Sequence, residues 1–420
     1  MSLTGNAIVA QSGGPTAVIN ASACGAIQAA LDSGDVTAVY GATNGILGVL
    51  QEDLFDIGAE KAETIEAMKW TPSAAIGSCR YKIKTEADLA RIVDVFKAHD
   101  IRYFFYAGGN DSMDTADKVA KLAGSQDFEM RVIGIPKTID NDLACTDHTP
   151  GYASVSKFLA TQAMEAGRDT EALYTHDTAT VMETMGRNAG WIAAATGVAH
   201  REAEDAPHLV YVPEVPVTFE KIAADCKEVL GRIGRIFVVA AEGLTDPDGE
   251  YLTSRTGAFA QDAFGHKQLG GIAELLSGVI EEKVGVKCRY IKHATAQRNA
   301  AHFASLVDRD EAYACGARAV ELALAGESGW MVTMERKSSS PYEIELSRAQ
   351  LSDVANGESK LPRAYVNEAG NHITDAMRDY VTPLMKGEVE VPIGDDGLPS
   401  FMRFERKPLD RKCAPWEPPK

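Results

Sequence analysis

The chain has 420 residues, enough for two or three domains, and its 45% hydrophobic and 24% charged residues are the proportions of an ordinary soluble globular protein. Its net charge of −18 leaves no long-range positive field, which excludes nucleic acid as an expected partner. No segment approaches the length of a membrane span. The short apolar run near Met1 lacks the basic residues of a signal peptide, so it is predicted to be a first strand.

Seven cysteines are scattered along the chain, and no two of them have the CxxC spacing of a metal or redox pair. An odd number of dispersed cysteines is typical of reduced thiols, so the sequence predicts a cytoplasmic protein without a zinc site. The seven residues are Cys24, Cys79, Cys145, Cys226, Cys288, Cys315 and Cys413.

Alternating apolar runs and helical patterns predict an α/β domain in the first 150 residues. Its strands are predicted at Ala7–Ala10, Val36–Tyr40, Tyr103–Tyr106 and Val132–Ile135. Its helices are predicted at Val18–Leu31, at Leu89–His99 and from the loop at 107–113 to about Leu122. Each strand ends in a loop with glycines or polar residues, so these loops are expected to share one rim and to bind a nucleotide or a phosphate.

Two of these loops contain paired glycines. Gly13 and Gly14 separate the first strand from its helix, where the backbone is open to a ligand and helix N–H groups can bind an anion. The loop at 108–111 reads Gly-Gly-Asn-Asp, with Asp111 or Ser112 as the predicted N-cap of the next helix. A tight turn is the more common meaning of such a loop, so the glycines indicate a phosphate site only in combination.

The fourth predicted strand ends at Pro136, and the loop after it carries Lys137, Thr138, Asp140 and Asp142. The carboxyl end of a strand is where an open α/β sheet binds its ligands. A proton acceptor beside a fixed positive charge is what phosphoryl transfer to a sugar hydroxyl needs. A charged turn in solvent would explain this stretch alone about as well, so the other loops decide between the two interpretations.

A second α/β lobe is predicted after residue 150. Its strands are predicted at Ala179–Thr184, His208–Val212, Arg235–Ala240 and Lys287–Ala294. Its helices are predicted at Ser154–Ala166, after Trp191 to about Ala199, at Phe219–Leu230 and at Leu269–Ile280. A helix at Asp310–Ala325 and a strand at Trp330–Met334 follow, and the region from Tyr365 onward is rich in proline and charge.

Single cations are informative in an acidic chain. Arg187 is predicted at the start of a helix, where a cation opposes the helix dipole unless an anion compensates. A phosphate held by two guanidinium N–H groups would compensate, and a surface pair with Glu183 is the alternative. Arg80 and Lys82, which follow a Gly-Ser turn, fit solvated surface charge about as well as a site.

Six motifs together resemble those of the phosphofructokinases, in the same order and spacing, over roughly residues 5 to 335. They are GGP near the start, GGND at 108–111, PKTIDND at 136–142, MGRNAG at 185–190, AEG at 241–243 and QR at 297–298. The resemblance implies two three-layer α/β/α Rossmann-like domains with the active site in the cleft between them. It places a pyrophosphate- and Mg²⁺-binding domain at 1–150 with about 309–345, a sugar-phosphate domain at 151–308, and a C-terminal extension at 346–420.

The resemblance also implies roles for single residues. Asp140 matches the base that takes a proton from the C1 hydroxyl of fructose 6-phosphate, with Lys137 and Asp111 in the same catalytic set. The residues that match the donor site are Gly13, Gly14, Gly109 and Lys137. The residues expected to contact the sugar phosphate are Thr138, Ile139, Asp140, Met185, Gly186, Arg187, Glu242 and Arg298. Mg²⁺ is expected near Asn110 and Asp142.

Two positions indicate the phosphoryl donor. ATP-using members usually have GGDG and PGTIDND in the two loops, where this chain has Asp111 and Lys137. A carboxylate where the α-phosphate of a nucleotide would lie repels ATP, and an ammonium beside the donor stabilises a leaving phosphate. Both changes are those of the pyrophosphate-dependent branch, so a reversible transfer from pyrophosphate to fructose 6-phosphate, giving fructose 1,6-bisphosphate, is expected.

An ATP-dependent phosphofructokinase is the alternative on the same fold. A non-catalytic subunit that senses a sugar phosphate would be expected to lack the base or the lysine, and this chain has both. An NAD-linked dehydrogenase is disfavoured because the first loop lacks GxGxxG. The resemblance implies a homodimer or homotetramer with small-molecule substrates.

The chain departs from the family pattern at three positions. Asn110 stands where a metal-binding aspartate is expected, and its amide oxygen can ligate Mg²⁺ without adding charge. Thr178 stands where many members have an arginine that reaches a neighbouring subunit, so this position supplies no cation to a shared 6-phosphate site. Arg309 aligns with a second family arginine only through an insertion, so no role is assigned to it.

Overall fold

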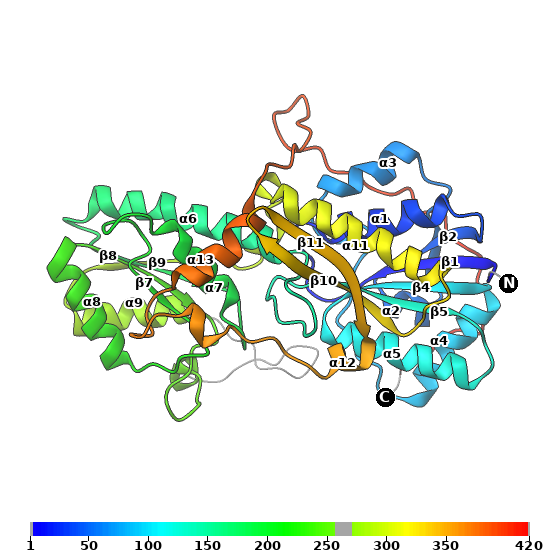
Figure 1. The fold of residues 1–420 in the computed structure, drawn as a ribbon, viewed down its shortest axis with the longest axis horizontal. Coiled ribbons are helices and arrows are strands. Elements are labelled where there is room, and N and C mark those ends of the chain that lie inside the picture. Colours follow the sequence, from blue (N-terminus) through cyan, green and yellow to red (C-terminus); the bar gives the residue numbers. More distant parts are fainter. Residues whose placement is uncertain (1–2, 257–270, 419–420) are drawn as a thin grey trace.

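The computed structural model of the protein describes residues 3–256 and 271–418. Within these residues, one sheet has seven strands in the order β11-β10-β5-β4-β1-β2-β3, and a second has four in the order β7-β8-β6-β9. Figure 1 shows the two sheets in separate lobes that lie side by side along the long axis, each between layers of helices. The predicted α/β class is therefore confirmed.

The seven-stranded sheet forms the first lobe. Its strands are β1 (Gly5–Gln11), β2 (Val36–Ala42), β3 (Leu54–Asp56), β4 (Ile101–Gly108), β5 (Arg131–Pro136), β10 (Trp330–Ser339) and β11 (Tyr342–Gln350). Strands β1, β4 and β5 pair in parallel, so their carboxyl ends lie at one edge of the sheet. The loops that follow these three strands carry Gly13, the 108–111 stretch and Lys137, so the fold brings them together as predicted.

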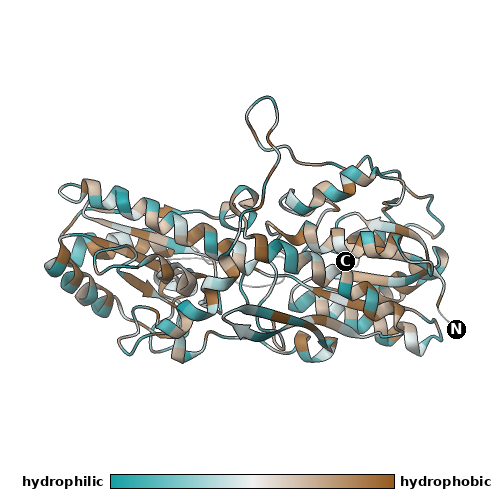
Figure 2. Ribbon diagram, turned by 45° about the horizontal axis from the view of Figure 1, so that its top comes forward, coloured by the Kyte–Doolittle hydropathy of each residue, from teal (hydrophilic) through white to brown (hydrophobic). Residues whose placement is uncertain are grey.

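Helices cover both faces of this sheet. Those on one face are α1 (Ile19–Leu31) and α11 (Leu306–Leu324), which contact each other. Those on the other face are α2 (Ile46–Gln51), α4 (Glu86–Ala98) and α5 (Asn110–Ser125). A short helix, α3 (Ala62–Glu66), packs beside α1. Strands buried on both faces are hydrophobic throughout, and Figure 2 shows them as a mostly hydrophobic layer inside more hydrophilic helices.

The four-stranded sheet forms the second lobe. Its strands are β6 (Ala179–Thr184), β7 (Leu209–Tyr211), β8 (Ile236–Ala241) and β9 (Cys288–Lys292), all parallel to their neighbours. Its helices are α6 (Tyr152–Leu173) and α7 (Trp191–Thr196) on one face, and α8 (Phe219–Ile233) and α9 (Ile272–Lys283) on the other. A short helix, α10 (Ala296–Asn299), follows β9. The predicted start of α9 at Leu269 lies outside the described residues.

The C-terminal extension spans both lobes. After β11 the chain forms α12 (Leu351–Ala355) against α5 in the first lobe, and then α13 (Asp375–Val381) against α7 in the second. It returns to the first lobe, where the N–H of Leu409 donates to the carbonyl of Leu54 at 2.9 Å. Figure 1 shows this path in orange and red, with one loop extending away from the body.

Some local elements differ from the sequence prediction, among them two strands and one helix cap. The sequence does not predict strands β3 and β11, because three residues are too few for a periodic pattern and β11 has only half-buried and exposed positions, without a continuous apolar run. Helix α5 begins at Asn110 and its N-cap is Gly109, so neither Asp111 nor Ser112 caps it.

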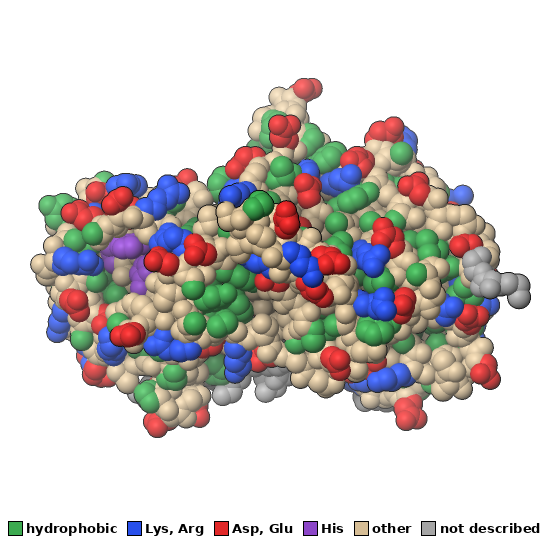
Figure 3. All heavy atoms as spheres, in the orientation of Figure 1, with side chains coloured by type: hydrophobic (Ala, Val, Ile, Leu, Met, Phe, Trp, Pro, Cys, Tyr) green, Lys and Arg blue, Asp and Glu red, His purple; other side chains and the backbone are tan. Residues whose placement is uncertain are grey.

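The surface carries both signs of charge. On the face shown in Figure 3, acidic and basic side chains are interspersed over both lobes. None of the helices in the described ranges combines the length and the apolar character that a membrane span requires.

Candidate active site

Lys137 lies against the first glycine loop. Its side chain is 3% exposed, and Nζ donates to the carbonyl of Gly14 at 2.8 Å. A Cβ atom on Gly13 would lie 3.0 Å from the same nitrogen, and Gly13 has a φ of +77°. Any larger residue at Gly13 would therefore be strained and would crowd the ammonium, which explains the glycine at this position.

Two guanidinium groups lie beside this ammonium. A Cβ atom on Gly14 would lie 2.9 Å from Nη1 of Arg298 and 3.8 Å from Nη2 of Arg80. Burial, with smaller contributions from the two guanidiniums and against the opposing effect of Asp140, lowers the pKa of Lys137 to about 8. Three cations held around two glycines repel one another, so the arrangement favours a bound anion.

Arg80 is the site residue that sequence reasoning left undecided. The sequence supports surface charge and a site about equally for the two cations after the Gly-Ser turn, and the structure places them differently. Arg80 lies by Gly14, whereas the side chain of Lys82 is 55% exposed. The hydroxyl of Ser78 and the carbonyl of Cys79 both bond the backbone of Gly13, which fixes this turn against the glycine loop.

The loop after β5, which we call the catalytic loop for the base expected in it, presents two carboxylates. The hydroxyl of Thr138 accepts from the N–H of Asp140 at 3.0 Å and also bonds the carboxylate of Asp142. Burial and the nearby carboxylate of Glu242 raise the pKa of Asp140 to about 6. Burial and Asp140 raise the pKa of Asp142 to about 7. The side chain of Ile139 packs into the core of the second lobe and so attaches the loop to that lobe.

The second lobe contributes two tightly packed loops. Gly186 has a φ of +124°, and a Cβ atom on Gly243 would collide with the backbone of Arg187, so the AEG loop packs on the MGR loop. The N–H of Met185 donates to Oε1 of Gln297 at 3.0 Å, which joins the MGR loop to the QR turn. Burial and Glu183 raise the pKa of Glu242 to about 7.

Arg187 does not stand at a helix start, which corrects the prediction. Helix α7 begins at Trp191, so Arg187 lies in the preceding loop. Glu183, the alternative partner, accepts instead from the N–H groups of Gly271 and Ala273 and lies 3.4 Å from Nζ of Lys292. The helix dipole therefore gives no support for a phosphate at Arg187, and the support that remains is the position of Arg187 close to Asp140.

Charged side chains from both lobes lie near the carboxylate of Asp140. The pKa of Asp140 responds to Lys137 on the first lobe and to Glu242, Arg187 and Arg298 on the second. Residues from four separate loops are thus close enough to interact electrostatically. This convergence is what the motifs predicted.

The Gly-Gly-Asn-Asp loop lies at the start of α5. Asp111 is in the first turn of that helix, and its carboxylate lies 3.8 Å from Nζ of Lys82, with 43% of its side chain exposed. Nδ2 of Asn110 donates to the carbonyl of Gly357 at 2.8 Å, while its Oδ1 is buried and has no hydrogen-bond partner among the residues that the structure describes. A carbonyl can only accept, so the amide nitrogen faces Gly357 and Oδ1 faces the other way.

The donors present fit Mg²⁺ that is shared with a substrate. In the described ranges, no group of three or more His, Cys, Asp or Glu side chains is placed to hold a metal by itself. Mg²⁺ usually keeps several waters and binds one or two carboxylates together with substrate phosphates. The buried orphan oxygen of Asn110 and the carboxylate of Asp142 are suitable ligands of this kind.

A segment of the C-terminal extension lies between these loops and forms hydrogen bonds to both lobes. We call residues 357–361 the crossing segment. Its Ser359 donates to the carbonyl of Asp142 at 2.8 Å and accepts from Nε1 of Trp191 at 3.0 Å. Its Leu361 donates to Glu214 at 2.9 Å, and Glu214 also accepts from the N–H of Gly190. No sequence motif indicated these contacts.

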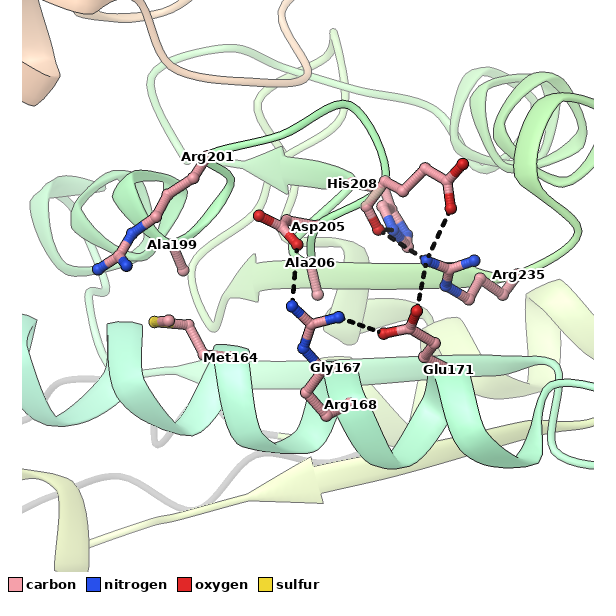
Figure 4. Close-up of a pocket in the computed structure, with 11 residues that line it drawn as sticks. Met164, Gly167, Arg168, Glu171, Ala199, Arg201, Asp205, Ala206, His208 and Arg235 are labelled. Carbon is pink, nitrogen blue, oxygen red and sulfur yellow. Dashed lines mark hydrogen bonds and ion pairs between the residues drawn. The ribbon is translucent and has the colours of Figure 1, made fainter.

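A separate cavity of about 100 Å³ lies at the opposite edge of the second sheet. Its lining includes His208 and Arg235, which directly precede β7 and β8, whereas the site loops follow carboxyl ends. Figure 4 shows Arg168 and Arg235 paired with carboxylates, among them Glu171, which contacts both arginines. Carboxylates neutralise Arg168 and Arg235, which disfavours a phosphate beside them, so this cavity is not the proposed site.

Comparisons with known proteins match this chain over almost its whole length. A sequence model of the family described as Phosphofructokinase matches residues 6–323. A pyrophosphate–fructose 6-phosphate 1-phosphotransferase of Halomonas elongata is 44% identical over 97% of this chain and 98% of its own. One of Xanthomonas campestris pv. campestris is 42% identical over 98% and 99%. A crystal structure of pyrophosphate-dependent phosphofructokinase from Marinobacter aquaeolei superposes with a TM-score of 0.90 at 40% identity, covering 99% of this chain and all of that one.

Proposed function

The chain belongs to the phosphofructokinase family, and from this premise we propose that it transfers a phosphoryl group from pyrophosphate to the C1 hydroxyl of fructose 6-phosphate. The products are fructose 1,6-bisphosphate and phosphate, and the reaction is reversible. Relatives at 42–44% identity that carry the pyrophosphate name support this reaction over the ATP-dependent alternative.

The observation that carries the donor assignment is the buried ammonium of Lys137. It lies within hydrogen-bond distance of the glycine loop and beside Arg80 and Arg298. A compact set of cations stabilises a leaving phosphate that has no nucleotide attached. The carboxylate of Asp111 at the start of α5 adds negative charge where a nucleotide would have to lie, which favours the smaller donor.

We assign the acceptor site to the loops of the second lobe. Arg187 and Arg298 hold the sugar 6-phosphate, and Glu242 with Met185 and Gly186 lines the sugar. Guanidinium groups suit this role because they bind phosphate oxygens with two N–H groups at once. The supporting observation is that the MGR loop, the AEG loop and the QR turn pack on one another beside Asp140.

Asp140 takes the proton from the C1 hydroxyl as that oxygen attacks the phosphorus of pyrophosphate. Lys137 stabilises the charge that develops on the transferred and leaving groups, and Thr138 orients both carboxylates of the loop. Mg²⁺, when bound, neutralises charge on the pyrophosphate oxygens. Asn110 and Asp142 are the residues that would hold it. A sugar-phosphate-sensing subunit would not need this base and lysine in one cleft.

We also propose a cytoplasmic homodimer or homotetramer whose two domains divide near residue 150, as predicted. The predicted boundaries at 308 and 345 fall inside α11 and β11, which both belong to the first lobe. The seven cysteines are free thiols, which suits a reducing compartment. The first and second sheets fall on either side of residue 150, and β10 returns to the first sheet.

Initial rates with fructose 6-phosphate and Mg²⁺ test the reaction, with pyrophosphate and ATP compared as donors on the same purified protein. Turnover with pyrophosphate and none with ATP is the expected result. Turnover with ATP alone would overturn the assignment of Asp111 and Lys137. No turnover with either donor would overturn the proposed reaction as a whole.

A further inference from the structure

Helix α13 of the C-terminal extension reaches the catalytic loop. The family match ends at residue 323, and Tyr380 on α13 lies far beyond it. The hydroxyl of Tyr380 accepts from Nδ2 of Asn141 at 2.9 Å and donates to the carbonyl of Asp147 at 2.7 Å. One buried hydroxyl thus bonds the middle and the end of the loop that carries Asp140 and Asp142.

Asn141 is buried in that loop and has an unusual backbone conformation. It stands between the two carboxylates, is 2% exposed, and has a φ of +55°, a conformation that L residues rarely adopt. The hydroxyl of Thr149 donates to the carbonyl of Thr138 and lies 3.4 Å from Oδ1 of Asn141. Because a left-handed residue between two carboxylates sets the directions of both, whatever holds Asn141 also orients Asp140 and Asp142.

Tyr380 is itself held rigidly. Its ring lies 5.2 Å from the ring of Trp191 and 4.5 Å below the guanidinium of Arg336, and Arg336 also donates to its carbonyl at 2.8 Å. Burial raises the pKa of Tyr380 well above its ordinary value, so the hydroxyl stays protonated and can donate and accept at once. The side chain is 7% exposed.

We propose that Tyr380 is a positioning residue of phosphoryl transfer: its hydroxyl holds Asn141 and thereby orients the carboxylates of Asp140 and Asp142. The inference rests on the proposed function for its kinetic test. Tyr380 touches no reacting atom, and it acts only through the amide of Asn141. A ring that served only as core packing would leave the hydroxyl without a role.

The first test is Tyr380→Phe, which keeps the ring and removes the hydroxyl. We expect kcat to fall about tenfold, the effect of one lost hydrogen bond in the reacting geometry. The KM for fructose 6-phosphate should stay within twofold, because the loops of the second lobe are untouched. Equal kcat for Tyr380→Phe and the wild type, per folded enzyme, would overturn the proposal.

The matched control is Tyr365→Phe. Tyr365 belongs to the same aromatic cluster, 5.5 Å from Tyr380 and 5.9 Å from Trp191, and among the described residues its hydroxyl has no hydrogen bond to the catalytic loop. The two variants remove the same atom from one cluster, so a general packing effect would lower kcat in both. A fall confined to Tyr380→Phe supports positioning.

Asn141→Gly tests whether Tyr380 acts through the side chain of Asn141. Glycine tolerates the φ of +55° and removes the side-chain amide. The double variant with Tyr380→Phe should lose less than twofold more activity than Asn141→Gly alone. If the loss of activity in the double variant equals the product of the losses in the two single variants, Tyr380 acts independently of Asn141, which would overturn the proposal.

Hydrogen exchange of the peptide covering residues 136–149 tests whether Tyr380 holds the catalytic loop, and it does not depend on enzyme activity. Faster exchange there in Tyr380→Phe, and not in Tyr365→Phe, is expected because the loop loses its anchor. Unchanged exchange would overturn the proposal even if the enzyme is active. If the wild type fails to turn over pyrophosphate, the proposed function fails, and the exchange result still tests the position of Tyr380.

Discussion

The side-chain amide of Asn110 donates a hydrogen bond of 2.8 Å to the carbonyl of Gly357, a residue 247 positions later in the chain. Gly357 begins the crossing segment, which then bonds the backbone of Asp142 through Ser359. The two residues proposed to hold Mg²⁺ therefore share one structural support. The cleft is assembled by the C-terminal extension as well as by the strand-end loops.

Substitution of Asp140 tests the base. We expect Asp140→Asn to lower kcat by about a thousandfold, because a positioned base contributes about 10² to 10⁴ to proton transfer. The KM for fructose 6-phosphate should change little. Steady-state rates measure the effect, and Asp114→Asn, which alters a surface carboxylate paired with Lys118, is the control. A loss below tenfold would assign the proton transfer elsewhere.

Substitution of Asp111 tests donor choice. Asp111→Gly removes the carboxylate beside the donor, so we expect measurable turnover with ATP and a several-fold loss with pyrophosphate. Rates with both donors at fixed fructose 6-phosphate provide the comparison. Asp114→Gly carries the same glycine penalty of about 1 kcal/mol in the same helix and should leave donor choice unchanged. An Asp111→Gly enzyme that still ignores ATP contradicts our account of this carboxylate.

Removal of the Asn110 amide tests the metal site. Asn110→Ala deletes the buried orphan oxygen, so the Mg²⁺ concentration for half-maximal rate should rise about tenfold. Thermal stabilisation by Mg²⁺ and pyrophosphate should weaken in parallel. Asn356→Ala, which removes an exposed amide bonded to the carbonyl of Ser352, is the control. An unchanged Mg²⁺ requirement would remove Asn110 from the metal site.

A buried histidine makes stability depend on pH. His148 lies between Asp147 and Glu311, at 2.8 Å and 2.7 Å, and is 1% exposed. Burial alone would lower its pKa, but the two carboxylates raise the pKa to about 9. A folded-state pKa above the unfolded value of about 6.5 means that this contribution is complete below pH 6.5 and is lost as the pH rises towards 9.

Between pH 7 and 8.5 the free energy of unfolding should therefore fall by about 2 kcal/mol from this group. Urea denaturation at several pH values measures it. In His148→Gln the protein should be less stable at neutral pH, and its stability should be nearly flat over the same interval. A wild-type stability that rises from pH 7 to 8.5 would show that His148 is neutral in the folded protein.

The local pattern of apolar and polar residues was sufficient to predict most of the strands and the types of side chain in the loops that follow them. Strand β6 has the bounds predicted from its apolar run, and Lys137 follows β5 as expected. Apolar periodicity reports burial over a few residues, and parallel strands place the loops that follow them at one edge. Most of the candidate site therefore follows from strand ends, glycines and the charged residues beside them.

Sequence alone thus determined the α/β class, the loops that the structure brings together, and the family, and it is the source of the proposal that Asp111 and Lys137 select the donor. Only the tertiary structure decided that Arg80 faces the donor loop while Lys82 does not, that Arg187 precedes its helix, and that Tyr380 bonds Asn141 across 239 positions. A single contact between distant segments cannot be predicted from the hydrophobic periodicity of either segment, because the contact depends on how the two lobes pack. For the same reason, the sequence does not show that the C-terminal extension contacts the loops of the candidate site.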